Sequence, residues 1–588
     1  MEKQTGNFQE GIHTPDFWER YRERLLPAAV IADRFRETES LDGVWRYGID
    51  QYDSCLRNRW FEERETDGDG RALPLDYSFD HWDTIRVPSC WNLHSEKLFL
   101  YEGSVVYTRK FSYRSRGEQR VFLKFGGANY RAAVFVNQSY LGLHQGGSTP
   151  FYVEVTGLLQ AENRLLVVVN NTRRRGGVPA DNTDWFNYGG LYRGVELIRL
   201  PGAFIRSFSA GLEPDGRFNR IYARVGIDGA RDGVAILKIP ELGLAAEIRV
   251  KDGQGAVSLP AAPELWSPGH PKLYDVSVEF GSDKLTERIG FREIRAEGRE
   301  ILLNGKSIFL KGVCAHEESV TNGKSVTEEE IRENYALAKE MNCNFMRLAH
   351  YPHSEAAARI ADEAGILLWA EIPVYWAIEF DDPAVYADAE NQLTALIARD
   401  INRASVILWS VGNENADTDA RLAFMGALAD KARALDGTRL ISAACLVDHE
   451  KLEITDRLAE KIDVIGINEY YGWYDPDFSK LPRMFANSQP QKPVIISEFG
   501  ADAKAGHHGP REEMYSEEFQ LAVYEKQLET LSAIDYVKGI SPWIFFDFRC
   551  PRRLHFMQNH YNLKGLLSAD KQHRKLAFYA MQRFYGRD

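Results

Sequence analysis

The feature that most constrains the fold is an alternation of short apolar runs and helical segments after Ile301. The apolar runs are Ser307–Leu310, Asn344–Arg347, Ile366–Ala370, Val406–Val411, Arg439–Ser442, Val464–Ile467, Val494–Ser497 and Gly539–Phe545. The helical segments between them are Glu328–Glu340, Ser354–Ala364, Val385–Ile401, Asp419–Leu435 and Ser516–Leu531. Eight strand–helix units within roughly 290 residues predict a (β/α)8 TIM barrel.

The part of the chain before the barrel is β-rich. Short apolar or alternating runs separated by Gly, Asn and Pro predict an N-terminal β-sandwich over residues 1–202. A second group of alternating runs, of the length of an immunoglobulin-like β-sandwich, occupies residues 203–292. We therefore expect a multidomain protein with the barrel over residues 293–588, since 588 residues exceed what a single core holds.

Charge and cysteine usage narrow the class of protein. A net charge of −13 argues against a nucleic-acid-binding surface. The six cysteines have no metal-site or disulfide-scaffold spacing, so buried thiols are expected. The polar segment Met1–Glu10 lacks the apolar core of a secretory signal, and no run approaches the ~18 apolar residues that span a bilayer. These patterns predict a cytoplasmic protein without membrane segments.

Polar residues that close the apolar runs are the candidates for chemistry, because TIM barrels carry their active sites at the carboxyl ends of the strands. They are His316 with Glu317, His350, Glu371, Glu414, Glu469, Glu498 and Asp547. Glu414 and Glu498 follow directly from long apolar runs, in Ser410–Asn415 and Pro493–Gly500. Two glutamates at two strand ends suggest glycoside hydrolysis, the commonest chemistry of paired carboxylates.

Longer phrases extend this pattern over nearly the whole chain. The barrel carries Asn304–Lys306, Lys311–Val313, His316–Glu317, His350–His353 and Asn468–Tyr474, and the sandwich carries Leu41–Trp45, Val87–Asn92, Tyr101–Ser104 and Phe186–Arg193. With these phrases the sequence resembles glycoside hydrolase family 2, and within it the β-glucuronidases. The resemblance implies that the N-terminal sandwich is a jelly-roll, sugar-binding-like domain.

The resemblance also implies roles for single residues. Glu498 takes the role of the nucleophile and Glu414 that of the acid/base in a retaining, double-displacement hydrolysis. Asn413 is expected to bind the sugar 2-hydroxyl and Tyr470 to steady the nucleophile. Asp184 resembles the acidic residue that the sandwich lends to bind sugar hydroxyls. His350, Asn468, Tyr474 and Trp543 complete the expected substrate contacts, and neither a metal nor a cofactor is required.

Substrate choice depends on Asn562–Gly565, which matches the Asn-x-Lys motif of the β-glucuronidases. The ammonium of Lys564 and the amide of Asn562 suit a sugar carboxylate, and a neutral hydroxymethyl group leaves them unpaired. The alternative is a solvated loop. Arg549, Arg552 and Arg553 precede this motif and either contact substrate, including a polyanion or an epimeric uronate, or form salt bridges within the loop.

The sequence therefore predicts an exo-β-glycosidase that releases terminal β-D-glucuronic acid from a conjugate or an oligosaccharide end. The nearest alternative is a β-galacturonidase or β-galactosidase on the same scaffold, and a remote one is a non-catalytic carbohydrate-binding protein. We expect a homo-oligomer. Trp543 and Trp473 suit a core position as well as a sugar platform, and Glu469 is an acid that the family pattern does not require beside Tyr470.

Overall fold

The computed structural model describes residues 17–27, 29–33, 36–64, 66–73, 78–117 and 119–587. The segment Met1–Glu10, from which a cytoplasmic location is predicted, lies outside these residues. The chain divides into two compact units, and each is described by itself. The first contains residues 1–29, 37–172 and 187–200, and the second contains residues 30–36, 173–186 and 201–588.

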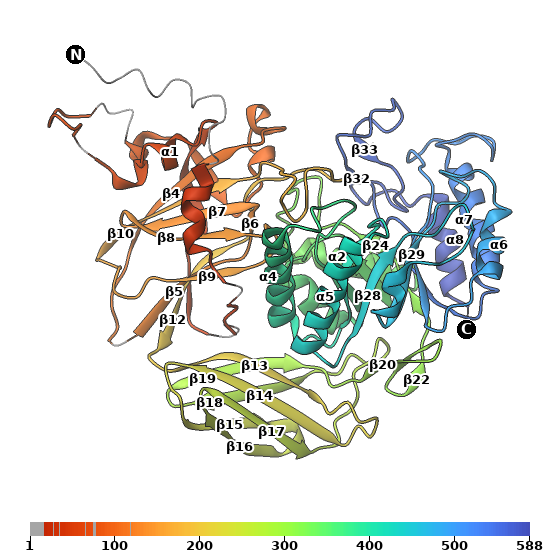
Figure 1. The fold of residues 1–588 in the computed structure, drawn as a ribbon, viewed down its shortest axis with the longest axis horizontal. Coiled ribbons are helices and arrows are strands. Elements are labelled where there is room, and N and C mark those ends of the chain that lie inside the picture. The colour runs from red at the N-terminus through yellow and green to blue at the C-terminus, as the bar shows by residue number, and fades with distance from the viewer. Residues whose placement is uncertain are drawn as a thin grey trace. The chain divides into compact units, whose positions relative to one another are not determined.

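The first unit is an antiparallel β-sandwich of two sheets (Figure 1). One sheet has the order β1 (Thr38–Ser40), β12 (Val195–Pro201), β5 (Gln119–Phe125) and β9 (Phe151–Glu154). The other has the order β3 (Thr84–Val87), β2 (Gly43–Asp50), β4 (Ser104–Ser112), β10 (Glu162–Asn170), β7 (Arg131–Val136) and β8 (Ser139–Gln145). Alternate residues of both sheets meet in one apolar cluster, which confirms the predicted sandwich.

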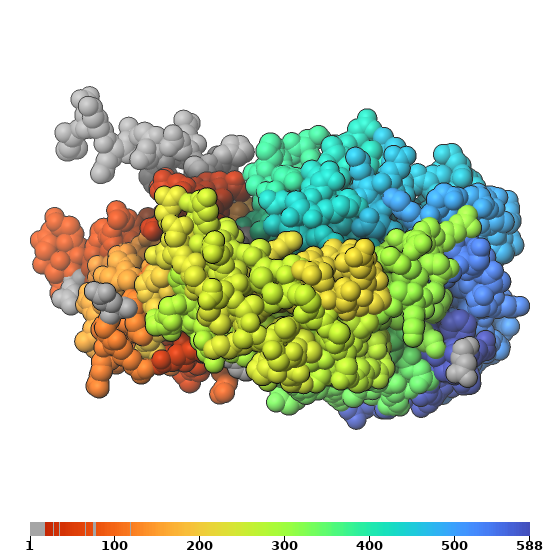
Figure 2. Space-filling model, turned by 90° about the horizontal axis from the view of Figure 1, so that it is seen from below, coloured from red at the N-terminus to blue at the C-terminus, as the bar shows by residue number. Residues whose placement is uncertain are grey.

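The second unit begins with a seven-stranded antiparallel domain. Its order is β13 (Phe204–Leu212), β14 (Arg220–Asp228), β17 (Gln254–Pro260), β16 (Leu244–Lys251), β15 (Gly233–Ile239), β18 (Tyr274–Phe280) and β19 (Asp283–Ile289). Figure 2 shows these residues, in yellow and yellow-green, as a continuous layer. A small sheet of β20 (Ile294–Glu297), β21 (Glu300–Leu303) and β22 (Lys306–Ser307) connects this domain to the barrel.

The rest of the second unit is a parallel barrel. Its strands are β23 (Leu310–Lys311), β24 (Cys314–Ala315), β25 (Phe345–Leu348), β26 (Leu367–Glu371), β27 (Val406–Asn413), β28 (Leu440–Cys445), β29 (Val464–Asn468), β30 (Val494–Glu498) and β31 (Val537–Ile540). β23 pairs with β31 and β24 pairs with β25, so these two pieces of one strand close the sheet. The predicted TIM barrel is confirmed.

Helices lie outside the strands in Figure 1. They are α2 (Glu328–Glu340), α3 (Glu355–Ala364), α4 (Pro383–Asp400), α5 (Asp419–Leu435), α6 (Lys480–Asn487), α7 (Glu517–Leu531) and α8 (Leu576–Tyr585). Local chemistry sets several ends. Thr327 and Glu330 form a capping box before α2. Gly365 ends α3 at φ +71°, where an added Cβ atom would meet the Pro268 carbonyl oxygen at 2.5 Å.

All eight predicted barrel strands differ in their bounds from the observed ones, the first and the last among them. The run Ser307–Leu310 was expected to be the first strand, but Ser307 belongs to β22 and the barrel strand begins at Leu310. The last strand, β31, ends at Ile540 rather than Phe545. An apolar run marks burial, and burial continues beyond the paired residues of β31 as far as Phe545. The first run instead includes the exposed Ser307, where the chain still belongs to the small sheet before the barrel.

Candidate active site

A cavity of about 620 Å³ is lined by residues from the carboxyl ends of the barrel strands and the loops that follow them. Ten of the twelve predicted site residues line it: Asp184, His350, Glu414, Asn468, Tyr470, Tyr474, Glu498, Trp543, Asn562 and Lys564. Asn413 lies behind this wall and is buried. Arg549 does not line the cavity, because Glu318 and the carbonyls of Ser319 and Val320 bind its guanidinium.

Period-two alternation in the strands places two charged residues inside the barrel. Phe345, Leu367 and Trp369 pack in the same interior cluster, whereas the residues between them face the helices. Arg347 lies two residues after Phe345, and Glu371 lies two residues after Trp369, so both face the barrel interior by the same alternation. Both side chains are fully buried, so their charges must be satisfied by protein groups.

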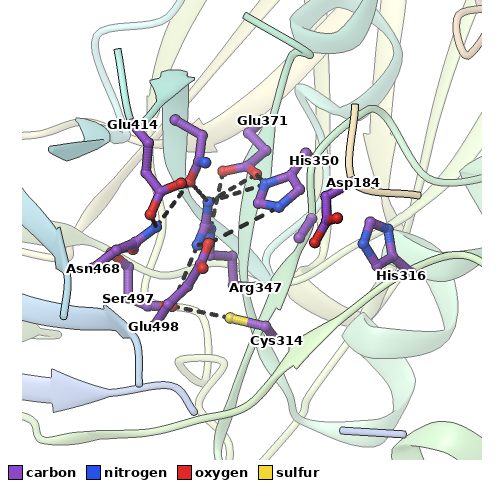
Figure 3. A network of polar contacts seen from close by, with 12 residues as sticks. Asp184, Cys314, His316, Arg347, His350, Glu371, Glu414, Asn468, Ser497 and Glu498 are labelled. Atoms are coloured by element: carbon purple, nitrogen blue, oxygen red, sulfur yellow. Dashed lines mark hydrogen bonds and ion pairs between the residues drawn. The ribbon is translucent and has the colours of Figure 1, made fainter. Parts of the chain in front are cut away.

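Arg347 is the centre of the polar network in Figure 3. Its Nε and Nη2 donate to the two oxygens of Glu371, each at 3.1 Å, and its Nη1 donates to Glu498 Oε1 at 2.7 Å. Its Nη2 also donates to Asn413 Oδ1 at 2.7 Å. Arg347 therefore joins three strand ends, β26, β27 and β30.

The Glu371 carboxylate is a permanent negative charge in this network. Burial raises its pKa, but the Arg347 guanidinium and a hydrogen bond with His350 outweigh burial and hold the pKa at about 2. His350 Nδ1 lies 2.8 Å from Glu371 Oε1, and its ring stacks on Trp543 with centroids 4.8 Å apart. Glu371 thus orients Arg347 and His350 behind the cavity wall.

Glu498 ends β30 with both carboxylate oxygens engaged. Tyr470 Oη donates to Oε2 at 2.6 Å, and Arg347 Nη1 binds Oε1. Burial and the neighbouring Glu498 charge raise the pKa of Tyr470 well above its usual value, so the phenol keeps its proton as a donor. Two donors, one of them a cation, thus hold both oxygens of Glu498 in place.

Glu414 has the opposite environment. Trp376 Nε1 donates to its Oε2 at 2.7 Å and Asn468 Nδ2 donates to its Oε1 at 3.1 Å, but no cation pairs with it among the described residues. Burial, followed by the nearby Glu498 charge, raises the pKa of Glu414 to about 7. Its backbone has φ +52°, a strained conformation for a non-glycine residue that turns the side chain out of the strand end.

Asn413 is held with its amide in one orientation. Its Oδ1 accepts from Arg347 Nη2 and from Asn468 Nδ2, the latter at 3.2 Å. Because the oxygen accepts both bonds, the other amide atom is the nitrogen, and this buried Nδ2 has no partner among the described residues. Asn413 therefore offers an unused donor next to Glu414.

The Asn-x-Lys segment forms a second polar cluster in the cavity. Lys564 Nζ is buried and donates to Asp502 Oδ1 at 2.6 Å and to Tyr474 Oη at 3.3 Å. Burial lowers the pKa of Lys564, but the Asp502 charge outweighs it and keeps the pKa raised. Asn562 Oδ1 accepts from the Lys564 backbone N–H, and the buried Asn562 Nδ2 has no partner in the part of the chain that the structure describes.

Buried ion pairs hold this segment in place. Asp547 Oδ1 accepts from the Gly565 N–H at 2.9 Å and from Lys575 Nζ at 2.7 Å. Lys575 also donates to the Leu563 carbonyl. Asp547, a candidate from its strand-end position, thus supports the loop.

Glu469 lines the cavity, but its Oε2 accepts from Gln527 and the Tyr471 N–H, and burial raises its pKa to about 8.

Asp184 comes from the segment 173–186, which belongs to the barrel unit. Its Oδ2 is ion-paired with Arg553, its Oδ1 accepts from Cys550 Sγ at 3.2 Å, and Arg552 Nε lies 3.7 Å from the same Oδ1. Tyr474 Oη accepts from Arg553 at 3.4 Å. Each of the three arginines thus lies within salt-bridge distance of a carboxylate, and Arg552 and Arg553 also line the cavity.

Sequence reasoning missed Arg347, Trp376, Asp502 and the supporting role of Glu371. Alternation within β25 and β26 was the available signal for Arg347 and Glu371. No local pattern marks Trp376 or Asp502, since each follows a strand end in an irregular segment.

Among the described residues, no group of three or more His, Cys, Asp or Glu side chains has the arrangement of a metal site. No helix of this part of the chain is long and apolar enough to cross a membrane.

Comparisons with known proteins follow the same domain order. Models of the glycosyl hydrolases family 2 match residues 38–201 (sugar binding domain), 244–292 (the family 2 model) and 294–586 (TIM barrel domain). A β-glucuronidase of Paenibacillus borealis is 29% identical over 594 residues, covering 92% of this chain and 96% of the relative.

Two solved structures show the same likeness. The β-glucuronidase of Bifidobacterium dentium complexed with coumarin-3-O-glucuronide has a TM-score of 0.84 at 26% identity, covering 96% of this chain and 99% of its own. A family 2 β-galacturonidase of Eisenbergiella tayi bound to glycerol has a TM-score of 0.81 at 25% identity, covering 94% and 96%.

Proposed function

Because the chain belongs to glycoside hydrolase family 2, we propose that it is a retaining exo-β-glycosidase that releases terminal β-D-glucuronic acid. The observation that carries the proposal is the contrast between Glu414 and Glu498 in one cavity. Glu414 has a pKa of about 7, whereas Arg347 and Tyr470 hydrogen-bond Glu498. Double displacement requires one carboxyl group that can give up a proton near neutrality and a second carboxyl group held in position to attack, and these two environments suit those roles.

In the first step Glu498 attacks the anomeric carbon while Glu414 protonates the departing oxygen. Proton transfer leaves a charge on Glu414, and the N–H groups of Trp376 and Asn468 already point at the oxygens that carry it. In the second step Glu414 takes a proton from water, which attacks the glycosyl-enzyme. This sequence requires the two carboxyl groups to be about 5 to 5.5 Å apart.

The neighbouring groups stabilise the transition state without moving. Asn413 directs its unpartnered Nδ2 to the sugar 2-hydroxyl, where a hydrogen bond strengthens as positive charge develops on the ring. Tyr470 and Arg347 hold the attacking carboxylate in place while one of its oxygens forms the new bond. Because Arg347 also holds Asn413, the nucleophile and the 2-hydroxyl donor keep a constant separation.

Lys564 and Asn562 select the uronic acid. The Lys564 ammonium and the free Asn562 Nδ2 together bind the C6 carboxylate as charge-assisted hydrogen bonds. A neutral hydroxymethyl group would offer no charge to the Lys564 ammonium and would lose the charge-assisted hydrogen bonds, which disfavours galactosides. In this proposal His350, Trp543 and Tyr474 border the sugar, and Asp184 contacts its hydroxyls through the oxygens it shares with Arg553.

A β-galacturonidase is the second candidate, because the same anchor fits either uronate and the two sugars differ only at C4. The observation in its favour is the Asp184–Arg553 pair, which places a charged group among the hydroxyl contacts.

We further propose domain boundaries of 1–202, 203–292 and 293–588. The homo-oligomeric state and the cytoplasmic location stay predictions from the sequence.

The test is a panel of p-nitrophenyl β-D-glucuronide, β-D-galacturonide, β-D-galactoside and β-D-mannoside, with kcat/KM as the measurement. We expect the glucuronide to be the best substrate, and NMR of the fresh product to show the β-anomer first. A better galacturonide would support the second candidate. Turnover of galactoside at or above both uronides, or release of the α-anomer, would contradict the proposal.

A further inference from the structure

Three arginines precede the Asn-x-Lys segment, and the structure separates their roles. Glu318 and the carbonyls of Ser319 and Val320 bind Arg549 away from the cavity, while Arg553 pairs with Asp184. Arg552 lines the cavity with 46% of its side chain exposed. Its role is not explained by the contacts of its two neighbours.

Arg552 lies over the ring of Trp376. Its Cζ lies 5.1 Å from the Trp376 ring centroid, and its Nη1 donates to Asn182 Oδ1 at 3.1 Å. A guanidinium stacked on an indole is oriented by the ring and by the amide while its edge stays available to a ligand. Arg552 is therefore an oriented cation at the cavity rim.

The positive charge of Arg552 is incompletely neutralised by its neighbours. Among the described residues, Asp184 is the one carboxylate within 4.0 Å of the Arg552 guanidinium, at 3.7 Å, and the same carboxylate is already in close contact with Arg553. The other cations of the cavity have partners of their own: Lys564 pairs with Asp502 and Lys480 with Asp475. Two guanidinium groups that share one carboxylate leave one net positive charge at the rim.

The position of this charge relates it to the leaving group. Trp376 Nε1 binds Glu414 Oε2, so the Trp376 ring flanks the carboxyl group that protonates the departing oxygen. Arg553 binds Tyr474, which also binds Lys564 at the proposed uronate anchor. Both arginines therefore meet Asp184, but the further contact of Arg553 is with the uronate anchor and that of Arg552 is with the ring beside Glu414.

We propose that Arg552, supported by Trp376, binds an anionic group on the leaving group, so that the preferred substrates are uronides of acidic aglycones. This inference rests on the proposed function, and it adds a second recognition site for negative charge. The chemistry recognised is an oxyanion with two or three equivalent oxygens, a carboxylate or a sulfonate-type group, which matches the fork of a guanidinium.

The test compares 4-carboxyphenyl β-D-glucuronide with its neutral isostere, 4-carbamoylphenyl β-D-glucuronide. The carboxamide withdraws electrons more strongly and makes the better leaving group, so intrinsic reactivity opposes the expected result. We expect the wild-type kcat/KM ratio to favour the carboxylate by about tenfold at low salt, in the range of one hydrogen bond to a charged group. Added salt should reduce the ratio. A 4-sulfophenyl glucuronide against its sulfonamide shows which oxyanion is preferred.

Arg552→Gln should lower the carboxylate-to-carboxamide ratio to one or below, as intrinsic reactivity dictates, and remove its salt dependence. Arg511→Gln is the matched control, because Arg511 is an exposed arginine paired with Glu525 and does not line the cavity. It should keep the wild-type ratio. A wild-type ratio near one, or a preference that persists in Arg552→Gln, would overturn the inference while leaving the glucuronidase proposal intact. Failure to hydrolyse any glucuronide would overturn both.

Discussion

Arg347 Nη1 donates to Glu498 Oε1 at 2.7 Å from a guanidinium that is completely buried. The same guanidinium neutralises Glu371, so one cation serves two buried carboxylates. Its removal would leave both buried carboxylates without this cation, with Tyr470 still donating to Glu498 and Trp369 Nε1 to Glu371.

The first prediction concerns this pairing. Arg347→Met should destabilise the barrel by about 3–5 kcal/mol, because an unpaired buried charge is costly. Urea unfolding followed by tryptophan fluorescence measures the change. Adding Glu371→Gln to Arg347→Met should recover part of the loss, since it removes one of the two unpaired charges. An unchanged unfolding midpoint in Arg347→Met would show that the network does not stabilise the fold.

The second prediction concerns the nucleophile. Glu498→Gln should abolish turnover with the fold intact, and Glu498→Ala should lose a factor of about 10⁴ or more. Azide should partly restore Glu498→Ala and give the α-glucuronosyl azide, because the small anion enters from the side that the carboxylate leaves empty. Glu469→Gln removes another buried carboxyl group of the cavity and should form no azide adduct. Residual hydrolysis in Glu498→Gln would contradict the assignment.

The third prediction is a pH dependence. Glu414 must be protonated to act as the acid, and its pKa is about 7. Above that value the protonated fraction falls tenfold per pH unit, so kcat/KM should decline as the pH rises above about 7. The decline lies on the alkaline side because Glu414 acts as an acid. A required base would instead lower kcat/KM as the pH falls.

Glu414→Gln should remove this alkaline decline. Rates with alkyl glucuronides should fall by about 10² to 10⁴, while p-nitrophenyl glucuronide, whose leaving group needs no proton, should be affected less in the first step. Trp376→Phe is a milder variant. It removes the N–H that binds Glu414 Oε2 and should shift the pH profile without abolishing it. An unchanged alkaline limb in Glu414→Gln would exclude Glu414 as the acid.

The fourth prediction concerns substrate choice. Lys564→Ala should reduce kcat/KM for p-nitrophenyl β-D-glucuronide by about 10- to 100-fold, the range of a charged hydrogen bond, and should affect the galactoside much less. Lys480→Ala is the control, since Lys480 lines the same cavity but pairs with Asp475. Equal losses for uronide and galactoside in Lys564→Ala would remove the anchor assignment.

Much of the fold was predictable because it depends on periodic patterns. The helix predicted over 328–340 is α2 and that over 419–435 is α5, both with unchanged bounds, because capping residues and apolar periodicity agree there. α6 was not predicted. Its eight residues contain a proline, and a segment of that length has too few turns for a clear period.

The site was predictable where a residue type stands at a strand end within a longer phrase. Glu414, Glu498, Asn562 and Lys564 have this signal, and the structure brings all four to one cavity. Arg549 has the same charge and neighbourhood as Arg552 in the sequence, yet only Arg552 lines the cavity. Which way each arginine points depends on partners such as Glu318 and Asp184, hundreds of positions away.

The sequence by itself determined the order of domains, the barrel and the pair of glutamates, because these follow from local periodicity and short-range phrases. Only the tertiary structure decided that Arg347 holds Glu498 and that Trp376 and Asn468 contact Glu414. Protonation at each carboxyl group depends on burial and on charges within a few ångströms. Those neighbours come from separate strands and loops, so their positions exist only once the barrel has closed.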